Sequence, residues 1–376
     1  MDNLHNTPHF HRIGIVAGLA PTRARALIER LKRTLLRDFG PAALDEFWEA
    51  PEAKIDEITA LRDEKMIVLD AALECERRKA ELLIVVTDTK TDYEREIAAE
   101  TTLPLYFWRA NNLDQVINDL CTMQLSSRIL GCKIGMIGGL GPAATVDLFD
   151  KIVRNTHAST DQEHFKLVIE ENPQIPDRTA CLLAGGEDPT VSLYHAAKRL
   201  EEAGCNAIII PCNTAHAFVP TLKRRISIPF IDMQESTLEA IRSKFHDARV
   251  GLLATSGTIA TGIYSAKAEK MGITLEVPDE SYQKLVMSAI YGEKGAKAGY
   301  TDGLCRKELL TAAEHLVRDK NCTVLILGCT ELPLILDEAD AFPLAGKTVA
   351  FVDPTATLAR RVVEFAELRN AARGVR

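Results

Sequence analysis

The sequence predicts an α/β protein built from doubly wound parallel sheets, and three recurring features predict it. A short apolar run, preceded by a basic residue and followed by a small-residue turn, occurs at 12–21, 133–142 and 249–258. A helical stretch and a second apolar run follow each time, and a closing apolar run comes at 105–107, 230–232 and 351–353. Strands that alternate with helices over such distances indicate parallel sheets with helices on both faces.

The first strand of each repeat carries a glycine at the same place, namely Gly14, Gly135 and Gly251. Matching spacing and a shared glycine favour duplication of one unit over a chance likeness between βαβ units. We therefore predict two pseudo-symmetric catalytic half-domains and a third, degenerate copy at the N-terminus. The predicted boundaries are 1–128 for the degenerate lobe, 129–248 for the first half-domain and 249–348 for the second.

The second apolar strand of each repeat ends in a short polar motif. The motif holds a cysteine in two copies, Cys212 and Cys329, and Thr87 in the first copy. Ligands of α/β sheets bind at the carboxyl ends of the strands. The expected site is therefore shared by the second and third copies, and the first copy has lost the chemistry.

Composition excludes several classes of protein. The 376 residues carry a net charge of -8 and no dense basic stripe, which argues against a nucleic-acid partner. No apolar run has membrane-spanning length, and the N-terminus lacks the pattern of a secretory signal, so we expect a cytoplasmic protein. Nine cysteines without a secreted-type framework are expected to be free thiols.

The two motif cysteines suit proton transfer at two faces of one carbon. Inversion of a carbon that bears hydrogen needs a base on one face and an acid on the other, and a thiol near a helix N-terminus can serve as either. Three other interpretations stay open for Cys212 and Cys329: small buried hydrophobes, a disulfide, or a metal site that includes His216. Cys205 and Cys322, at the amino ends of the same strands, are expected to be structural.

Polar neighbours of the cysteines are candidate ligand-binding groups. Turns that hold hydroxyl side chains and exposed N–H groups can bind a carboxylate, and capping of the next helix is the alternative role. Arg178 and Lys297 lie on loops and are candidate carboxylate clamps. For these two, a surface salt bridge with Asp177 and a solvated lysine are the alternatives.

The stretch from about 132 to 376 resembles the aspartate/glutamate racemase superfamily, in particular its aspartate-racemase-like branch. Five motifs carry the resemblance: 138–142, 172–179, 211–216, 254–258 and 328–333. The glutamate-racemase branch has an acidic residue, a serine and a histidine where this chain has Gly138, Gly139 and Glu331, which favours the aspartate-like branch. Residues 1 to about 130 have no counterpart in that family.

The resemblance implies an amino-acid racemase that uses neither pyridoxal phosphate nor a metal, with Cys212 and Cys329 as the proton-transfer residues. It implies that Arg178 and Lys297 hold the side-chain carboxylate of the substrate. It also implies that the closing segment, 349–376, packs back on the first half-domain. The remaining residues expected around the substrate are Asn213, Thr214, Thr255, Ser256, Thr330, Gly138, Gly139 and Gln174.

The expected activity is therefore interconversion of L- and D-aspartate, L- and D-glutamate, or both. One alternative is a maleate cis–trans isomerase-like or hydantoin-racemase-like reaction on another small acid. A non-catalytic amino-acid-sensing module is the other. The expected partners are a small dicarboxylic amino acid and, in a homodimer, a second copy of the chain.

Overall fold

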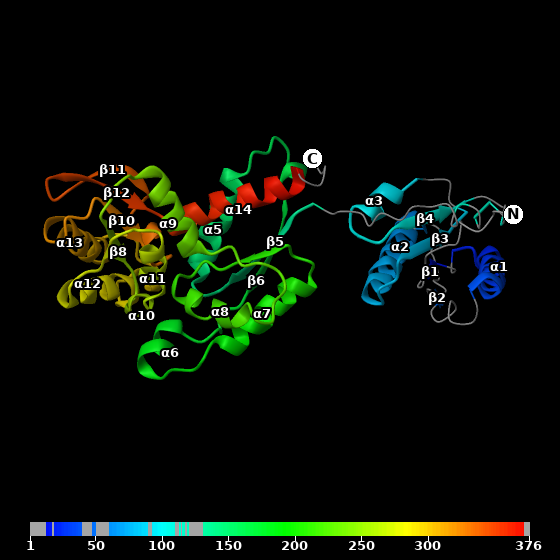
Figure 1. Ribbon diagram of the computed structural model, residues 1–376, viewed down its shortest axis with the longest axis horizontal. Coiled ribbons are helices and arrows are strands. Elements are labelled where there is room, and N and C mark those ends of the chain that lie inside the picture. The colour runs from blue at the N-terminus through cyan, green and yellow to red at the C-terminus, as the bar shows by residue number, and fades with distance from the viewer. Residues whose placement is uncertain are drawn as a thin grey trace. The chain divides into compact units, whose positions relative to one another are not determined.

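The computed structural model of the chain describes residues 13–16, 19–39, 47–49, 60–88, 92–109, 113, 115–116, 119 and 131–371. Two compact units, Met1–Leu130 and Gly131–Arg376, make up the chain. The described strands form mainly parallel sheets with helices between them (Figure 1), which confirms the predicted α/β class. Within the described ranges, every helix is too short or too polar to cross a bilayer.

The first unit contains a four-stranded parallel sheet in the order β2-β1-β3-β4. Apolar clusters cover both faces of this sheet, as a doubly wound fold requires. Its elements are β1 (Ile13–Val16), α1 (Pro21–Phe39), β2 (Phe47–Glu49), α2 (Ala60–Arg77), β3 (Leu82–Val86), α3 (Glu94–Ala98) and β4 (Leu105–Trp108).

Thr87, which stands where the other repeats have a cysteine, lies in a buried polar cluster of this first unit. Its hydroxyl and that of Tyr93 each donate to Oε1 of Glu64, both at 2.6 Å. Glu64 is itself buried. Burial, together with this carboxylate, raises the pKa of Tyr93. The end of β3 therefore holds a satisfied carboxylate and hydroxyls rather than a thiol.

The first half of the second unit is built on the parallel sheet β6-β5-β7, and a bridge from Ile208 to Phe230 extends it. Pro142 at the first turn of α5 and the Asp177 cap of α6 fix where those helices begin. Its elements are β5 (Lys133–Gly138), α5 (Pro142–Asn155), β6 (Lys166–Glu171), α6 (Arg178–Ala184), α7 (Thr190–Glu202), β7 (Ala207–Ile209), α8 (Val219–Leu222) and α9 (Met233–Lys244).

The second half is built on the sheet β11-β12-β10-β8-β9, parallel except for the β11–β12 hairpin. The strand order around the central strand is the same as in the first unit and the first half, and this supports duplication, which stays a prediction. Its elements are β8 (Val250–Leu253), α10 (Ser256–Ala260), α11 (Ile263–Lys270), β9 (Leu275–Glu276), α12 (Glu280–Tyr291), α13 (Leu304–Arg318), β10 (Val324–Leu327), β11 (Ala339–Leu344) and β12 (Lys347–Val352).

The repeated glycine of the first strand faces a sulfur atom in each sheet. A Cβ atom at Gly135 would lie 3.2 Å from Sγ of Cys205, and one at Gly251 would lie 3.2 Å from Sγ of Cys322. Gly14 faces Sγ of a cysteine on α2 more closely still. Burial raises the pKa of Cys205 and of Cys322 to about 11. These thiols fill core space at the amino ends of the strands, as expected of structural residues.

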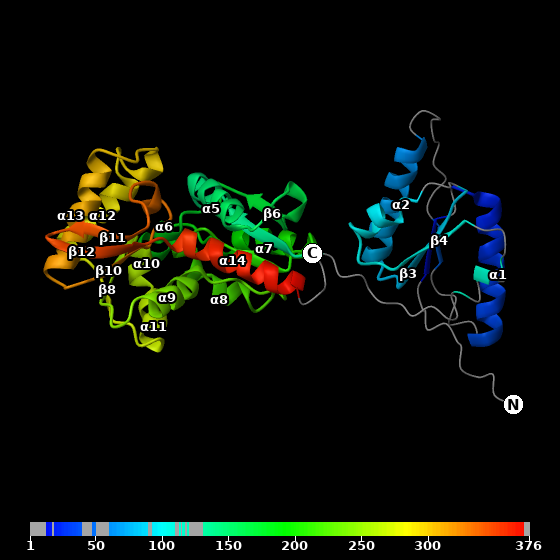
Figure 2. The same cartoon turned by 90° about the horizontal axis from the view of Figure 1, so that it is seen from above.

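Helix α14 (Pro354–Ala371) connects the two halves of the second unit. It follows β12, a strand of the second sheet, and packs beside α5 of the first half (Figures 1 and 2). Lys151 of α5 binds Asp353 at 2.5 Å and the hydroxyl of Thr355 at 2.8 Å. Of the expected closing segment, 349–376, the strand thus belongs to the second sheet and only the helix lies on the first half.

Candidate active site

Cys212 and Cys329 lie just beyond β7 and β10, at the carboxyl ends of the two sheets, and each is 7% exposed. Both line one cavity of about 10 Å³, which has room for a single water molecule. The cavity lies where the two halves meet, and both contribute to its wall. Its lining residues are Leu140, Arg178, Thr179, Cys212, Asn213, Thr214, Thr255, Tyr291, Lys297, Cys329, Thr330 and Glu331.

Three successive carbonyl groups hold the Cys212 loop in place. The carbonyl of Pro211 accepts from the hydroxyl of Thr330 at 3.2 Å, so this contact joins the two halves. The carbonyl of Cys212 is bound to Nδ1 of His216 at 2.9 Å, and that of Asn213 accepts from Nε2 of Gln234 at 3.1 Å. The backbone around the thiol is therefore fixed from three directions.

His216 holds this loop as a neutral ring. Its Nε2 accepts from the backbone N–H of Met233 at 3.2 Å, so its proton must be on Nδ1, which donates to the carbonyl of Cys212. Burial lowers the pKa of His216. Because both ring nitrogens have partners, His216 acts as a support for the loop and not as a metal ligand beside Cys212.

Arg178 is buried in the first half of the second unit. It does not form a surface salt bridge with Asp177, which is the alternative that the sequence allows. As the first residue of α6, it donates to the carbonyls of Leu140 at 2.5 Å, Ile175 at 3.2 Å and Pro176 at 3.0 Å. Burial opposes its charge, but the neighbouring groups Cys212, Asp177 and Tyr291 together outweigh that effect and raise the pKa of the guanidinium.

Polar atoms without a partner line the cavity in the first half. Among the described residues, both side-chain atoms of the Asn213 amide and Nε of Arg178 are buried and make no hydrogen bond. Asn213 is 3% exposed. Buried polar groups are nearly always hydrogen-bonded, and exceptions call for an explanation such as a ligand. These atoms are therefore available to a polar ligand with matching donors and acceptors.

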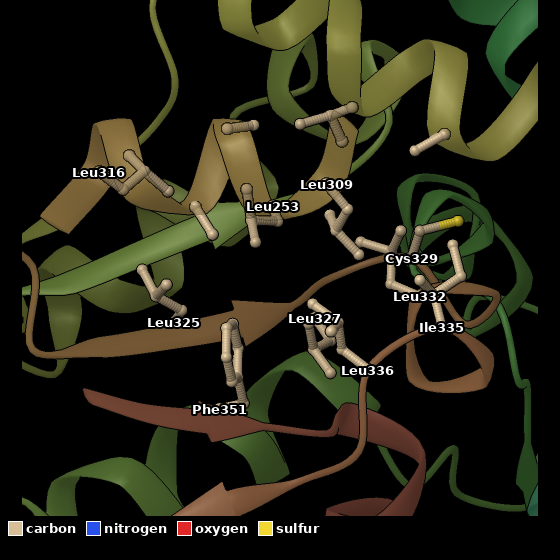
Figure 3. Close-up of a cluster of buried hydrophobic side chains, with 14 of the residues drawn as sticks. Leu253, Leu309, Leu316, Leu325, Leu327, Cys329, Leu332, Ile335, Leu336 and Phe351 are labelled. Carbon is tan, nitrogen blue, oxygen red and sulfur yellow. The ribbon is translucent and has the colours of Figure 1, made fainter. Parts of the chain in front are cut away.

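Glu331, which the sequence indicates as a polar neighbour of Cys329 and a marker of the branch, lies at the centre of the second half of the site. Its Oε1 binds Nζ of Lys297 at 2.6 Å, and its Oε2 accepts from Sγ of Cys329 at 2.8 Å. Burial, reinforced by this carboxylate, raises the pKa of the Cys329 thiol well above its usual range. Figure 3 shows Cys329 at the end of an apolar cluster with Leu332 and Ile335, which explains the burial.

The Lys297 side chain closes this part of the cavity. Partial burial disfavours its ammonium group, yet the nearby Glu331 carboxylate favours it, and the pKa of Lys297 is raised. Its Nζ lies 5.4 Å from the ring centre of Tyr291. The hydroxyl of Tyr291 in turn reaches Asp177 at 3.2 Å and Thr179 at 3.4 Å, across the boundary between the halves. The Lys297 side chain is 25% exposed and paired with Glu331, so it is not a freely solvated lysine.

A cluster of hydroxyl groups joins the Cys212 loop to α10. Oγ1 of Thr214 lies 3.0 Å from that of Thr255 and 2.9 Å from that of Thr258. Thr255 also caps α10 by accepting from the N–H of Thr258 at 3.1 Å. Thr255 thus both caps α10 and lines the cavity.

Eight of the predicted site residues line the cavity, and four do not. The eight are Arg178, Cys212, Asn213, Thr214, Thr255, Lys297, Cys329 and Thr330. Gln174 is exposed, and Ser256 bonds to neighbours on α12. Gly139 has φ of +85°, and a Cβ there would collide with the backbone of Asn172, so it admits the loop that leads to Arg178. Gly138 faces Glu171 and Thr145.

Four lining residues were missed as site residues: Leu140, Thr179, Tyr291 and Glu331. The sequence could have indicated Glu331, because an acidic residue two positions after a candidate catalytic cysteine can reach its thiol. Nothing in the sequence could have indicated Tyr291, since only the packing of α12 against α6 brings it to the site.

The second unit is similar to known racemases. The model of the Asp/Glu/Hydantoin racemase family matches residues 137–362. The chain is 28% identical over 223 residues to a glutamate racemase of Limosilactobacillus fermentum, covering 58% of this chain and 74% of that protein. It is 24% identical over 237 residues to the broad specificity amino-acid racemase RacX of Bacillus subtilis, covering 61% and 96%.

A solved racemase structure has the same fold as the second unit and matches a similar length of the chain. The aspartate racemase of Picrophilus torridus superposes with a TM-score of 0.53 at 29% identity, over 63% of this chain and 95% of that one. The family match spans more than half of the chain and includes both cysteines that line the cavity. This chain therefore belongs to the Asp/Glu/Hydantoin racemase family.

Proposed function

We propose that the chain racemises a small acidic amino acid, aspartate or glutamate, by proton transfer between its Cα and the thiols of Cys212 and Cys329. The single observation that carries the proposal is the opposed pair of cysteines on one cavity beside the unpartnered atoms of Asn213 and Arg178. In the proposed reaction the thiols of Cys212 and Cys329 are the only side chains that carry the proton.

The two thiols have opposite electrostatic surroundings, which assigns their resting roles. Cys212 faces the cation of Arg178, and a cation stabilises a thiolate. Cys329 donates its proton to the Glu331 carboxylate, which stabilises the thiol. In this state Cys212 removes the α-proton from one face while Cys329 delivers a proton to the other. The product state has the thiolate at Cys329, and the reverse reaction restores the first state.

Two cations in the cavity wall favour an acidic substrate. Arg178 and Lys297 line the cavity together with Glu331, whose carboxylate is paired with Lys297. The Nε–H of Arg178 and the amide of Asn213 are available to a carboxylate. Lys297 is placed to share its charge between Glu331 and a second carboxylate of the substrate. The names of the relatives, which include aspartate, glutamate and broad specificity racemases, support the same class.

Access to the site requires motion, because the cavity of about 10 Å³ is far smaller than an amino acid. Lys297 lies on the short turn η4 (Ala296–Ala298), between Gly295 and Gly299. Gly299 has φ of +90°, a conformation that glycine adopts readily. We infer that this turn moves with Lys297 when the substrate enters.

Exchange of the α-hydrogen in D₂O tests the proposal. Each enantiomer of aspartate and glutamate is incubated with the full chain, and optical rotation and deuterium at Cα are followed. The expected result is loss of rotation with one deuterium gained per inversion. Maleate, followed by ultraviolet absorbance, tests the isomerase alternative. Absence of both rotation loss and deuterium gain with all four amino acids would overturn the proposal.

A further inference from the structure

Gln234 is a buried side chain in the first turn of α9, and it contacts the loop of Cys212 without lining the cavity. It is 1% exposed. Helix α9 begins in the apolar cluster of the first half, to which Met233 belongs, and continues in that of the second half with Leu238 and Ile241. Gln234 therefore lies where the chain passes from one half to the other.

Both ends of the Gln234 amide are engaged, and its partners decide which end faces which way. Its Nε2 donates to the carbonyl of Asn213 at 3.1 Å, and its Oε1 accepts from Nζ of Lys267 at 3.0 Å. An ammonium group can only donate and a carbonyl can only accept, so an amide turned end for end would lose both bonds. Lys267 thus selects the orientation in which the amide donates to Asn213.

Lys267 is itself held by a second partner. It lies on α11, which packs beside α9 and belongs to the second-half cluster through Tyr264 and Ala268. Its Nζ also binds the carboxylate of Asp232, the residue that caps α9. The side chains of the lysine and the aspartate are 23% and 10% exposed, so salt screens this contact little. The charge that orients Gln234 therefore comes from the second half, whereas the loop it acts on belongs to the first.

The carbonyl that Gln234 binds belongs to the residue with the unpartnered amide. The same oxygen of Asn213 also accepts from the N–H of His216 at 3.1 Å, so both of its lone pairs have donors. A peptide unit is planar, so a carbonyl held by two donors fixes the plane of the bond between Asn213 and Thr214. This anchors the Asn213 backbone, and with it the amide side chain and the adjoining Cys212 thiol that line the cavity.

We propose that Gln234 is a positioning residue for the Cys212–Asn213 turn, with its orientation set by Lys267. Within the described residues its side chain bonds to Asn213 and Lys267, so it acts on the thiol through the backbone. The inference rests on the proposed function, because proton transfer at Cα requires the thiol to be held in one place. A small misplacement of a reacting group can slow a reaction by orders of magnitude.

Replacement of Gln234 by methionine in the full chain separates positioning from stability. In Gln234→Met the Asn213 carbonyl keeps the His216 N–H, and Lys267 keeps Asp232, so no buried partner is left unsatisfied. Methionine also fills a similar volume, and the melting temperature should therefore change little. By contrast, kcat should fall roughly tenfold or more because Cys212 loses its alignment, and KM should rise because the Asn213 amide is displaced.

Further variants separate orientation from bulk. Gln234→Glu keeps the shape and the contact with Lys267 but turns a carboxylate oxygen toward the Asn213 carbonyl, so its kcat should be lower than that of Gln234→Met. Lys267→Met frees the amide to turn and should also lower kcat, whereas Lys267→Arg keeps a cationic donor and should retain most of it. Lys347→Met is the matched control, because Nζ of Lys347 likewise binds an amide oxygen, that of Asn321 at 3.2 Å, near the amino end of β10. It should leave kcat and KM unchanged.

Alkylation supplies a readout that does not depend on racemisation. Release of the turn should expose Cys212, so its labelling by iodoacetamide should be several-fold faster in Gln234→Met than in the parent, while that of Cys205 stays the same. If the parent racemises and Gln234→Met keeps its kcat, KM and labelling rate, the inference is wrong and the proposed function stands. If the parent is inactive, the proposed function fails, and unchanged labelling of Cys212 would then overturn the positioning role as well.

Discussion

The thiol of Cys329 lies 2.8 Å from Oε2 of Glu331, whereas Cys212, on the opposite half, faces the guanidinium of Arg178. The two cysteines occupy equivalent positions in their sheets, yet one faces an anion and the other a cation. A symmetric fold thus holds an asymmetric pair of thiols, and the chemistry we propose depends on that difference.

Alkylation with iodoacetamide should distinguish the two thiols. The thiolate is the reactive form, and burial, reinforced by Glu331, holds the pKa of Cys329 well above its usual range. As pH is raised, the Cys212 peptide should therefore be labelled before the Cys329 peptide, as followed by mass spectrometry. Equal labelling of both peptides across the pH range would contradict the assigned resting roles.

Replacement of the carboxylate should change this order. In Glu331→Gln the negative charge is lost, so the pKa of Cys329 should fall and its labelling should begin at lower pH. Turnover that begins with Cys212 as base should slow, because a larger share of Cys329 then lacks the proton that it must deliver to the other face. Glu314→Gln, a surface change on α13, is the matched control and should leave both readouts unchanged.

Single cysteine variants should separate exchange from inversion. Cys329→Ala retains a base on one face only, so it should exchange the α-hydrogen of one enantiomer in D₂O without inverting it. Cys212→Ala should do this for the opposite enantiomer. Proton NMR and a chiral assay, read together, measure both. Full racemisation by either variant would contradict a two-thiol mechanism.

Structural thiols should make the protein less stable in alkali. The pKa of Cys205 and of Cys322 is about 11 in the fold, above the ordinary value near 8.5 in the unfolded chain. The folded state thus keeps its protons longer, and the free energy of unfolding should fall as pH rises from about 8.5 to 11. The expected loss is about 3 kcal/mol per thiol at the upper end.

Urea unfolding at several pH values checks this loss. Cys322→Ala should be less stable at neutral pH, because it leaves a cavity, but it should show a shallower decline in alkali. The pH slopes of Cys205→Ala and of the double variant should change additively. An unchanged slope in all three variants would show that other groups cause the alkaline loss.

Gly257 should be intolerant of a side chain. It lies where α10 meets α6, and a Cβ there would lie 2.9 Å from Oγ1 and 3.1 Å from Cα of Thr179. Gly257→Ala should therefore displace α6 and the adjacent Arg178, raising KM and costing about 1–3 kcal/mol of stability. A third close contact is to Cβ of Thr179 at 3.2 Å, and adding Thr179→Ala removes only the contact to Oγ1, so it should restore part of both losses. An unchanged KM in Gly257→Ala would show that α6 can shift without displacing Arg178, which would contradict this prediction.

Local pattern predicted the strands and the positions of the two cysteines, because strand ends are encoded by neighbouring residues. Cys212, Asn213 and Thr214 lie together in the sequence and in the site. The roles of Arg178 and Lys297 were harder to predict, since the burial of Arg178 and the pairing of Lys297 with Glu331 depend on tertiary packing. Gln174 and Gly139 were assigned to the site from their loop and turn, but the structure places them beside the cavity and not in its wall.

Long-range packing explains what sequence reasoning missed. Tyr291 reaches the site only because α12 packs next to α6 of the other half. Glu331 was visible in the sequence, but its partner Lys297 is 34 residues away, and only the fold shows that they meet. The pairing of Thr330 with Pro211 spans 119 residues and has no local signature.

Helix α14 is the last of the described elements to be synthesised on the ribosome. Leu358, Val362 and Ala366 share one apolar cluster with Ile134 and Met136, although they are synthesised more than two hundred residues later. While the chain emerges, α5 and α9 cover part of this face of the first-half sheet, and the rest stays uncovered until α14 has been made. The half that is made first is thus completed last, and a ribosome that stalls before α14 leaves an exposed apolar sheet for chaperones to protect.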